Sequence, residues 1–309
     1  MANIIKPVDR SLLEKELSDD KFVRKTNNGN NQIYIITHHN SPNVMKEIGR
    51  LRELTFRRAG GGTGKEIDID ELDTSEKCYR QLIVWDPRDM QIIGGYRFIH
   101  CKNIDYSEEG IPQIATAELF QMSERFVKDY LPLTIELGRS FVQPDYQPTV
   151  NSRKGIFSLD NLWDGLGALI VDNPDIKYFF GKVTMYPHFN TEARDIILYF
   201  LFKYFSDQDK LVVPFKSVEI ITDIDKLEKL FNGGNYGADY KMLISVLRKF
   251  NESIPPLVNA YMNLTSTMRT FGTAINEHFG NVEETGILVT IGDIYENKKE
   301  RHVATYKKD

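Results

Sequence analysis

The chain has 309 residues, which is long enough for one large or two ordinary domains with a sizeable hydrophobic core. Its 41% apolar and 27% charged residues are ordinary for a globular protein and exclude the disordered and fibrous classes. A net charge of −5 does not favour nucleic-acid binding, and two cysteines exclude a disulfide framework, so we expect a reducing, cytoplasmic location. The longest apolar run, residues 196–202, is far shorter than a membrane span, so any membrane contact is expected to be peripheral.

The first half of the chain predicts a strand, a helix and a hairpin. Residues 32–37 are rich in β-branched and aromatic side chains and predict a strand. The Ser-Pro pair at 41–42 is typical of an N-cap and a first helical position, and apolar residues at helical spacing extend this helix to Arg58. Strands at 81–85 and 92–101 flank a turn that contains Asp and Pro, which indicates an antiparallel hairpin.

The second half predicts further elements, in the order strand 134–142, helix 156–170, strand 177–185, a helix capped by Asn190, helices near 223–231 and 238–250, and strand 286–291. This order indicates a mixed α/β fold with antiparallel neighbours early and a β-loop-α-β unit in the middle. No repeat or Pro-rich linker divides the sequence. We therefore expect a core at 1–210 and a C-terminal extension at 211–309, packed on that core.

The strand at 135–142 is unusual, because it carries an acid, a glycine and an arginine within four positions of an otherwise apolar run. Strict alternation would bury Arg139 among apolar neighbours, on the face opposite Glu136. A bulge at Gly138 would bring both charged residues to one side and open the strand from its neighbour, exposing backbone N–H groups to a ligand. The alternative is a core ion pair that only fixes strand register.

Two other segments are candidate binding elements. Ser152, Arg153, Lys154 and Gly155 precede a helix, where free N–H groups and basic side chains favour a phosphate; the alternative is a solvated basic loop. The glycines at 60–64 lack the Lys-Ser/Thr of a P-loop and follow a helix, so we reject a nucleoside triphosphate site there. The six histidines and two cysteines show no metal-ligand spacing, and we expect no metal.

Five motifs in order carry a resemblance to a known family: Leu51-Arg-Glu-Leu-Thr-Phe-Arg-Arg-Ala-Gly-Gly-Gly-Thr-Gly-Lys65, Asp68-Ile-Asp-Glu-Leu-Asp73, Gln81-Leu-Ile-Val-Trp-Asp86, Ile93-Gly-Gly-Tyr-Arg97 and Glu136-Leu-Gly-Arg-Ser-Phe-Val-Gln-Pro-Asp-Tyr146. The chain resembles the hemolysin-like acyltransferases, which are similar to the ornithine-lipid and glycine-lipid N-acyltransferases of the GNAT superfamily. Acyl-homoserine-lactone synthases are more distant relatives of this group. The resemblance covers about residues 45 to 290.

This resemblance implies a GNAT-like fold, with a central, mostly antiparallel twisted sheet flanked by helices and followed by a C-terminal helical extension. It implies that the strands at 136–142 and 177–185 splay apart to hold the pantetheine arm of an acyl thioester. The implied reaction moves a fatty acyl group from acyl carrier protein or coenzyme A to the amine of a small amino acid, as in aminolipid synthesis.

Acyl transfer to an amine assigns roles to the unusual strand. Glu136 is expected to act as general base or ammonium anchor, and Arg139 to bind the substrate carboxylate or steady Glu136. Backbone N–H groups of Phe141 and Val142 are expected to stabilise the oxyanion. The segment Ser152–Gly155 would hold the phosphate of the donor.

Arg50, Arg57 and Arg58 make the first helix basic, and we expect them either to dock an acidic acyl carrier protein or to form a solvated helix face. Two alternative functions remain open at this point. One is an acetyl-CoA-dependent N-acetyltransferase, which a shallow pocket would favour. The other is a non-catalytic GNAT-like protein that binds acyl thioesters, because Gln81 and the single clear glycine of the phosphate loop depart from related sequences.

Overall fold

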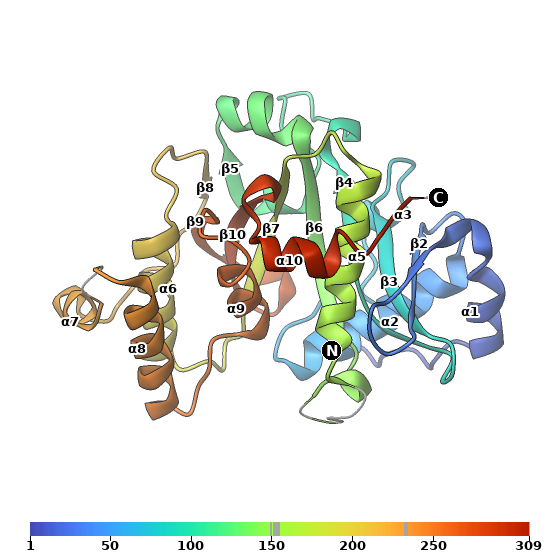
Figure 1. Ribbon diagram of the computed structural model, residues 1–309, viewed down its shortest axis with the longest axis horizontal. Coiled ribbons are helices and arrows are strands. Elements are labelled where there is room, and N and C mark those ends of the chain that lie inside the picture. Colours follow the sequence, from blue (N-terminus) through green and yellow to red (C-terminus); the bar gives the residue numbers. More distant parts are fainter. Residues whose placement is uncertain (149, 151–154, 232–233, 309) are drawn as a thin grey trace.

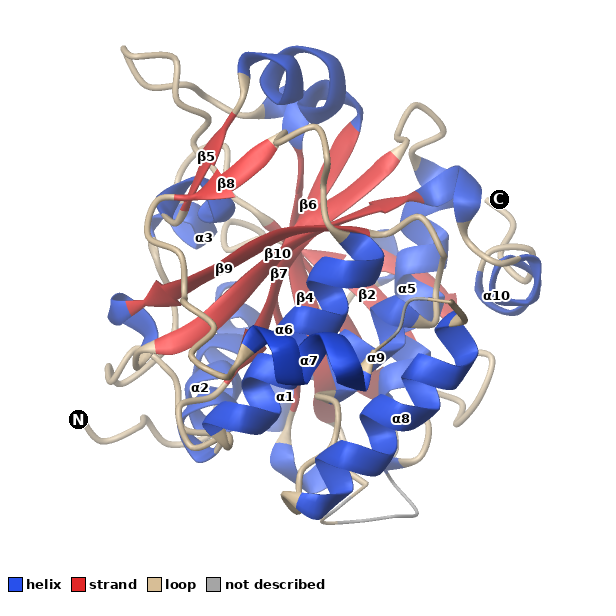
Figure 2. Cartoon of the chain, turned by 90° about the vertical axis from the view of Figure 1, so that its left-hand side faces the viewer, coloured by secondary structure: helices blue, strands red, loops and turns tan. Residues whose placement is uncertain are grey.

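A twisted eight-stranded sheet runs through the centre of the molecule, with helices on both faces (Figures 1 and 2). The computed structural model describes residues 1–148, 150, 155–231 and 234–308. The strands of this sheet, in spatial order, are β1 (Phe22–Lys25), β2 (Gln32–Ile36), β3 (Arg80–Asp86), β4 (Gln91–His100), β6 (Thr134–Val142), β7 (Tyr178–Met185), β10 (Val282–Thr290) and β9 (Arg269–Asn276). Neighbours pair antiparallel except β6 and β7, which are parallel. A second, two-stranded sheet pairs β5 (Phe120–Met122) with β8 (Val212–Pro214).

Helices cover the two faces of the large sheet unequally. The helices are α1 (Arg10–Glu16), α2 (Pro42–Arg58), α3 (Glu71–Thr74), α5 (Ser158–Asp172), α6 (Thr191–Phe205), α7 (Ile224–Leu230), α8 (Tyr236–Lys249), α9 (Pro256–Met262) and α10 (Glu296–His302). The largest core cluster joins α5, α6, α8 and α9 to one face, whereas α1 and α2 pack on the other face. A third cluster fills the space between the sheet and residues 101–131, on the same face as α2. We name the two sides of the sheet the α5 face and the α2 face.

The local predictions for the first half are confirmed with one change. The hairpin forms as predicted, and its turn is fixed by the Asp86 carboxylate, which accepts the Arg88 N–H at 2.9 Å. Ser41 occupies the N-cap position of α2, but its side chain caps no amide of the helix. Glu16 of α1 does so instead, because its carboxylate accepts the N–H groups of Asn43 and Val44 at 3.2 and 2.9 Å. A long-range contact has replaced the local cap.

The middle of the chain forms the predicted β-loop-α-β unit from β6, α5 and β7. Asn190 caps α6 by accepting the Ala193 N–H at 3.0 Å, also as predicted. The segment after residue 210 does more than pack on the outside, because β9 and β10 complete the large sheet next to β7. The sheet therefore crosses the predicted boundary at 210, and the division into core and extension stays a prediction.

Candidate functional site

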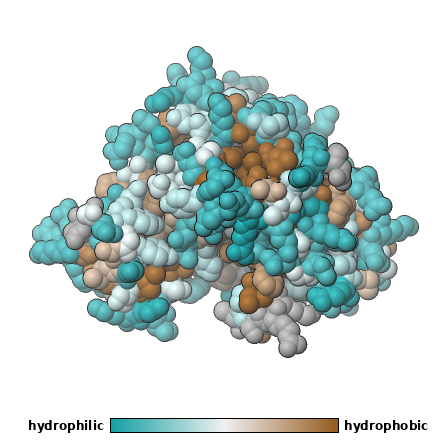
Figure 3. All heavy atoms as spheres, viewed as in Figure 1, coloured by the Kyte–Doolittle hydropathy of each residue, from teal (hydrophilic) through white to brown (hydrophobic). Residues whose placement is uncertain are grey.

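A split between two neighbouring strands is the main feature of the sheet. The parallel strands β6 and β7 pair from Thr134 with Tyr178 to Leu137 with Gly181, and the pairing ends there although both strands continue. A narrow cavity of about 20 Å³ lies at this point, between the β6 and β7 residues on either side of the split. Leu257 and Tyr261 of α9 close the cavity on the α5 face. The strands thus splay apart as the resemblance implied. A separate feature of the surface is a notch in the lower edge of the molecule, in the view of Figure 1 (Figure 3).

A bulge lies at the split, one residue further along than predicted. Arg97 of β4 pairs with Gly138 and Gly95 pairs with Phe141, so that two residues of β6, Arg139 and Ser140, face one residue of β4. Arg139 takes the left-handed backbone conformation, with φ at 48°, which is costly for a residue with a side chain. The bulge brings Arg139 to the α2 face, the same side as Glu136.

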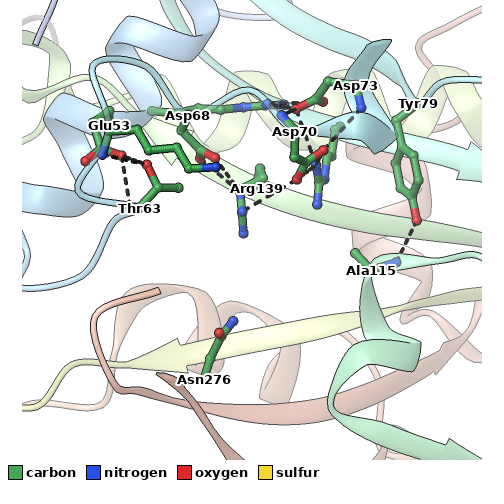
Figure 4. Close-up of polar contacts among 12 residues, drawn as sticks. Glu53, Thr63, Asp68, Asp70, Asp73, Tyr79, Ala115, Arg139 and Asn276 are labelled. Carbon is green, nitrogen blue, oxygen red and sulfur yellow. Dashed lines mark hydrogen bonds and ion pairs between the residues drawn. The ribbon is translucent and has the colours of Figure 1, made fainter. Parts of the chain in front are cut away.

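Ion pairs hold Arg139 in this strained position. Its Nε lies 2.9 Å from Asp68 Oδ2 and its Nη2 lies 3.7 Å from Asp70 Oδ2. The guanidinium also lies over the ring of Phe279, 4.2 Å from the ring centre. Figure 4 shows Asp68 and Asp70 converging on Arg139 from the segment that follows α2. These contacts offset part of the cost of the left-handed backbone.

The ion pairs continue into the protein as a buried network. Arg97 Nη1 contacts Asp70 Oδ2 at 2.7 Å and Asp73 Oδ2 at 3.4 Å, and Arg52 Nη1 contacts Asp73 Oδ2 at 3.1 Å. Burial alone would raise the pKa of Asp73, but the two arginines lower it well below its ordinary value. Arg52, Arg97 and Arg139 therefore alternate with three aspartates, and we call these six residues the upper wall.

Gln81, which departs from related sequences, belongs to the same network. Its side-chain oxygen accepts from Arg52 and its Nε2 donates to Asp73 Oδ1 at 2.9 Å. Gln81 therefore holds the buried charges in place. This contact explains the residue structurally, so its identity is no argument for a non-catalytic protein.

Glu136 lies in a closed hydrogen-bonded cluster on the α2 face. Its side chain is buried, with Oε1 accepting the Thr116 N–H at 2.7 Å and the Thr116 hydroxyl, and Oε2 accepting the Tyr79 hydroxyl. The Tyr79 oxygen in turn accepts the Ala115 N–H at 3.1 Å (Figure 4). Burial, and next the charge of Glu136, raise the pKa of Tyr79 well above its ordinary value. Glu136 is not among the residues that line the cavity, and the Thr116 and Tyr79 hydroxyls are the described groups that can relay a proton to its carboxylate.

The glycine loop at 60–64 wraps around an anion that belongs to the protein itself. Glu53 is buried in α2, and its carboxylate accepts the N–H groups of Thr63 and Gly64 at 2.9 and 2.8 Å. The Thr63 hydroxyl also donates to Glu53, at 2.8 Å (Figure 4). Because the internal carboxylate uses these amides, they are not free for a phosphate.

A second polar wall faces Arg139 from the other side of the split, and sequence reasoning missed it. Lys182 is the first residue of β7 beyond the last β6–β7 pair, and its Nζ lies 3.0 Å from Glu284 Oε2 of β10. Asn276 Nδ2 of β9 donates to the same oxygen at 3.2 Å. Figure 4 shows Asn276 on the opposite side from Arg139, on strand β9. We call Lys182, Asn276 and Glu284 the lower wall.

The predicted oxyanion donors lie on the freed part of β6. Phe141 and Val142 pair with Gly95 and Gly94 of β4, and they lie beyond the last pair with β7. The Gln143 N–H donates to Ile93 O of β4 at 2.9 Å, and because successive N–H groups alternate, the Val142 N–H lies on the edge towards β7. The side chain of Phe141 is buried against the cluster under α2.

The predicted phosphate segment is only partly described. Ser152, Arg153 and Lys154 lie outside the described residues. A side chain at Gly155 would put Cβ 2.4 Å from the Pro148 backbone nitrogen, so glycine is required there by close packing of the loop. Gly155 therefore has a structural role, and binding of a donor phosphate by this segment stays a prediction.

The predicted carrier-docking arginines are mostly occupied by partners within α2. Arg50 makes two contacts with Glu47, at 2.8 and 2.6 Å, and Arg57 makes two with Glu53, at 3.0 and 2.6 Å. Arg57 also donates to two backbone carbonyls, whereas Arg58 is exposed at the end of the helix. Carrier docking at these three residues stays a prediction.

Among the described residues no group of three or more His, Cys, Asp or Glu side chains could hold a metal ion. Over the same part of the chain, no helix combines the length and apolar character that a membrane crossing requires.

Comparisons with known proteins bear on the same segments. Residues 51–153 match the family described as acetyltransferase (GNAT) domain. The chain is 56% identical over 308 residues to the glycine N(alpha)-acyltransferase of Phocaeicola vulgatus, covering 100% of this chain and 94% of that protein. It is also 56% identical over 306 residues to the glycine N(alpha)-acyltransferase of Bacteroides thetaiotaomicron, covering 99% and 91% of the two chains. No solved structure matches the chain significantly.

Proposed function

This chain belongs to the family of the glycine N(alpha)-acyltransferases and carries a GNAT domain, and we propose that it transfers a fatty acyl group from an acyl thioester to the amine of glycine. The product would be an N-acylglycine, the core of an aminolipid. The observation that carries the proposal is the split between β6 and β7, because it offers an unpaired strand edge for a pantetheine arm and opens beside two polar walls.

The proposed reaction balances without a redox partner. The ammonium group of glycine loses one proton, and the resulting neutral amine attacks the thioester carbonyl carbon while the electron pair of the carbonyl moves to the oxygen. The Val142 N–H, on the edge of β6 towards β7, would stabilise that oxyanion, a contribution typically about 2.7–4 kcal/mol per donor. The nitrogen then gives up a second proton, and the carbonyl re-forms as the carbon–sulfur bond breaks. The leaving sulfur takes one of the two protons, so the products are the amide, the thiol and one free proton.

We propose Glu136 as the acceptor of the amine proton, through the Thr116 hydroxyl that donates to it. Lys182 supports this route, because this residue lines the cavity and its Nζ donates to the carbonyl of Ala115, the residue before Thr116, at 3.0 Å. General base catalysis of this kind typically contributes about 10²–10⁴-fold to the rate. Arg139 is proposed to steady this face of β6 through its ion pairs, since two aspartates already contact its guanidinium.

The donor is proposed to be acyl carrier protein or coenzyme A, with Ser152, Arg153, Lys154 and Gly155 near its phosphate. Docking of an acidic carrier would involve the exposed Arg58, with Arg50 and Arg57 contributing less because of their internal partners.

A second candidate function, the transfer of a short acyl group, follows from the size of the cavity. With about 20 Å³ it holds one water molecule, and this favours a short acyl group unless the α9 side chains move.

The test is a matrix of donors and acceptors. Acetyl, octanoyl and palmitoyl thioesters of coenzyme A and of acyl carrier protein are each incubated with the protein and a pool of amino acids, and the products are identified by mass spectrometry. We expect N-palmitoylglycine as the main product. N-acetylated products alone would select the short-chain enzyme, and thioester binding without any product would select a non-catalytic binding protein.

A further inference from the structure

The Lys182–Glu284 ion pair lies where β6 and β7 separate. In the reaction described above, this pair does not contact the amino acid that accepts the acyl group. Both side chains are largely buried, with exposed fractions of 12% for Lys182 and 6% for Glu284. Lys182 lines the cavity together with Gly138 and Gly181, so this residue borders the place where a thioester would enter, and its ammonium group contacts Glu284 and Ala115 O. Burying two charged groups costs free energy, because both lose their contacts with water. A buried ion pair at this position therefore suggests a function beyond stabilising the fold.

The pair keeps unused hydrogen-bonding capacity. Among the described residues, Lys182 uses two of its three N–H groups, one to Glu284 and one to Ala115 O. Both described contacts of Glu284, with Lys182 and with Asn276, go to Oε2 and leave Oε1 without a described partner. One donor on a cation and one acceptor on an anion are therefore available side by side.

The upper wall balances its charges internally. Each of its three arginines contacts at least one aspartate, and each aspartate contacts at least one arginine, so the charges are balanced within the wall. The lower wall faces it closely enough for the two to interact. Burial would raise the pKa of Glu284, but Lys182 first and then Arg139 lower it, which keeps the carboxylate ionised.

From this arrangement we propose that the Lys182–Glu284 pair binds the amino-acid acceptor as a zwitterion, with Glu284 receiving the ammonium group and Lys182 the carboxylate. The inference rests on the proposed function and names the acceptor site within it. A zwitterion with one carbon between its charged groups complements a fixed pair of opposite charges, because each end meets its counter-charge. Glu284 thereby places the amine at the split, beside the thioester, and Lys182 selects acceptors that carry a carboxylate.

The test measures KM for the acceptor in three variants. Glu284→Gln keeps the shape of the side chain and an oxygen for Lys182, but it removes the charge that attracts the ammonium group. We expect KM for glycine to rise at least about tenfold, the effect of losing one charge-assisted hydrogen bond, while KM for the acyl donor changes less than about twofold. The double variant Lys182→Gln/Glu284→Gln leaves no charge unpaired, so its fold is protected.

The double variant also tests recognition of the carboxylate. Glycinamide has the amine of glycine without the carboxylate, so the wild-type protein is expected to prefer glycine strongly. In the double variant this preference should disappear. Loss of discrimination is a readout that a purely structural ion pair would not change.

Glu283→Gln is the matched control, because Glu283 is the neighbouring residue of β10 and its partner is Arg194 of α6, at 2.6 Å. This control should leave KM for glycine and the preference over glycinamide unchanged. The proposal is overturned if Glu284→Gln alters stability or kcat with KM for glycine at the wild-type value, or if the double variant still prefers glycine.

Failure of the proposed function is distinguishable from failure of this inference. If the wild-type protein acylates another small amino acid and not glycine, the glycine assignment is wrong, and the same variants are compared with that amino acid. If the wild-type protein uses glycine and the variants behave like Glu283→Gln, the reaction stands and the acceptor site lies elsewhere.

Discussion

The substitution Glu136→Gln separates a catalytic role of this residue from its role in holding the fold. Glutamine has nearly the same shape, and its carbonyl oxygen can accept both hydrogen bonds from Thr116. Its amide group cannot accept the Tyr79 hydroxyl, which then has a proton without an acceptor in a buried site. Losing one hydrogen bond to a charged group typically costs about 1.5–3 kcal/mol, and we expect a decrease of this size in the free energy of unfolding.

The effect on activity should be larger than this loss of stability explains. If Glu136 accepts the amine proton, kcat should fall by about 10²–10⁴-fold, since the amide cannot take up a proton at neutral pH. Thiol release measured at saturating donor and acceptor gives kcat, and denaturant titration gives the free energy of unfolding. The two quantities are compared at the same pH and temperature.

Tyr79→Phe is the control for this experiment. It removes the same hydrogen bond, and with it the acceptor of the Ala115 N–H, but leaves the carboxylate and its contact with Thr116 intact. We expect a loss of stability at least as large and a kcat within a few-fold of wild type. A Glu136→Gln enzyme that turns over at nearly the wild-type rate would refute the proposed base, and a variant as stable as wild type would refute the hydrogen-bonded cluster.

Three further changes test other parts of the structure. Gly181→Ala would place Cβ 2.4 Å from Leu137 O, so it should cost about 1–3 kcal/mol of stability in denaturant titrations and raise KM for the acyl donor; unchanged values would contradict the described pairing. Asp73→Asn removes the carboxylate shared by two buried arginines, so stability should fall by about 3–5 kcal/mol, whereas a loss below about 1 kcal/mol would argue against the network. Asp73 and Glu284 both have a folded-state pKa below its ordinary value, 3.8 or 4.5, so their stabilisation is complete above pH 4.5 and is lost as the pH falls. The part of the melting temperature that depends on these two carboxylates should therefore decrease only below about pH 4.5, and a constant melting temperature down to pH 3 would contradict this.

Local signals account for the elements that could be predicted. The hairpin of β3 and β4 follows from two β-branched runs around an Asp-Pro turn, and α6 follows from Asn190 and an apolar face. The start of α2 was placed correctly for the same reason, yet its cap is Glu16, which lies 27 residues before Asn43. A partner so distant in sequence leaves no periodic trace, so composition and spacing could not identify it.

In the candidate site, too, local features could be predicted from the sequence, whereas contacts between distant residues could not. An acid and an arginine inside an apolar strand predicted a bulge and an opening, and both occur, with the bulge at Arg139 and Ser140. The acids at 68, 70 and 73 stood in the quoted motifs, but their pairing with Arg52, Arg97 and Arg139 depends on tertiary contacts. One signal in the sequence could have revealed this network. Arginines lie in apolar strands, and aspartates lie in the segment between the first helix and the hairpin, and such charges need partners of opposite sign when they are buried.

The amino-acid sequence alone determined the mixed α/β class, the hairpin, the strand at 134–142 with its charged residues, and the resemblance to N-acyltransferases. The tertiary structure decided which groups face the split. Glu136 turns into a closed cluster, and β10, more than 90 residues later in the chain than β7, brings Glu284 to Lys182. Periodicity describes the face of one element, whereas an ion pair across a sheet depends on strand order, and strand order is fixed only when the whole core packs.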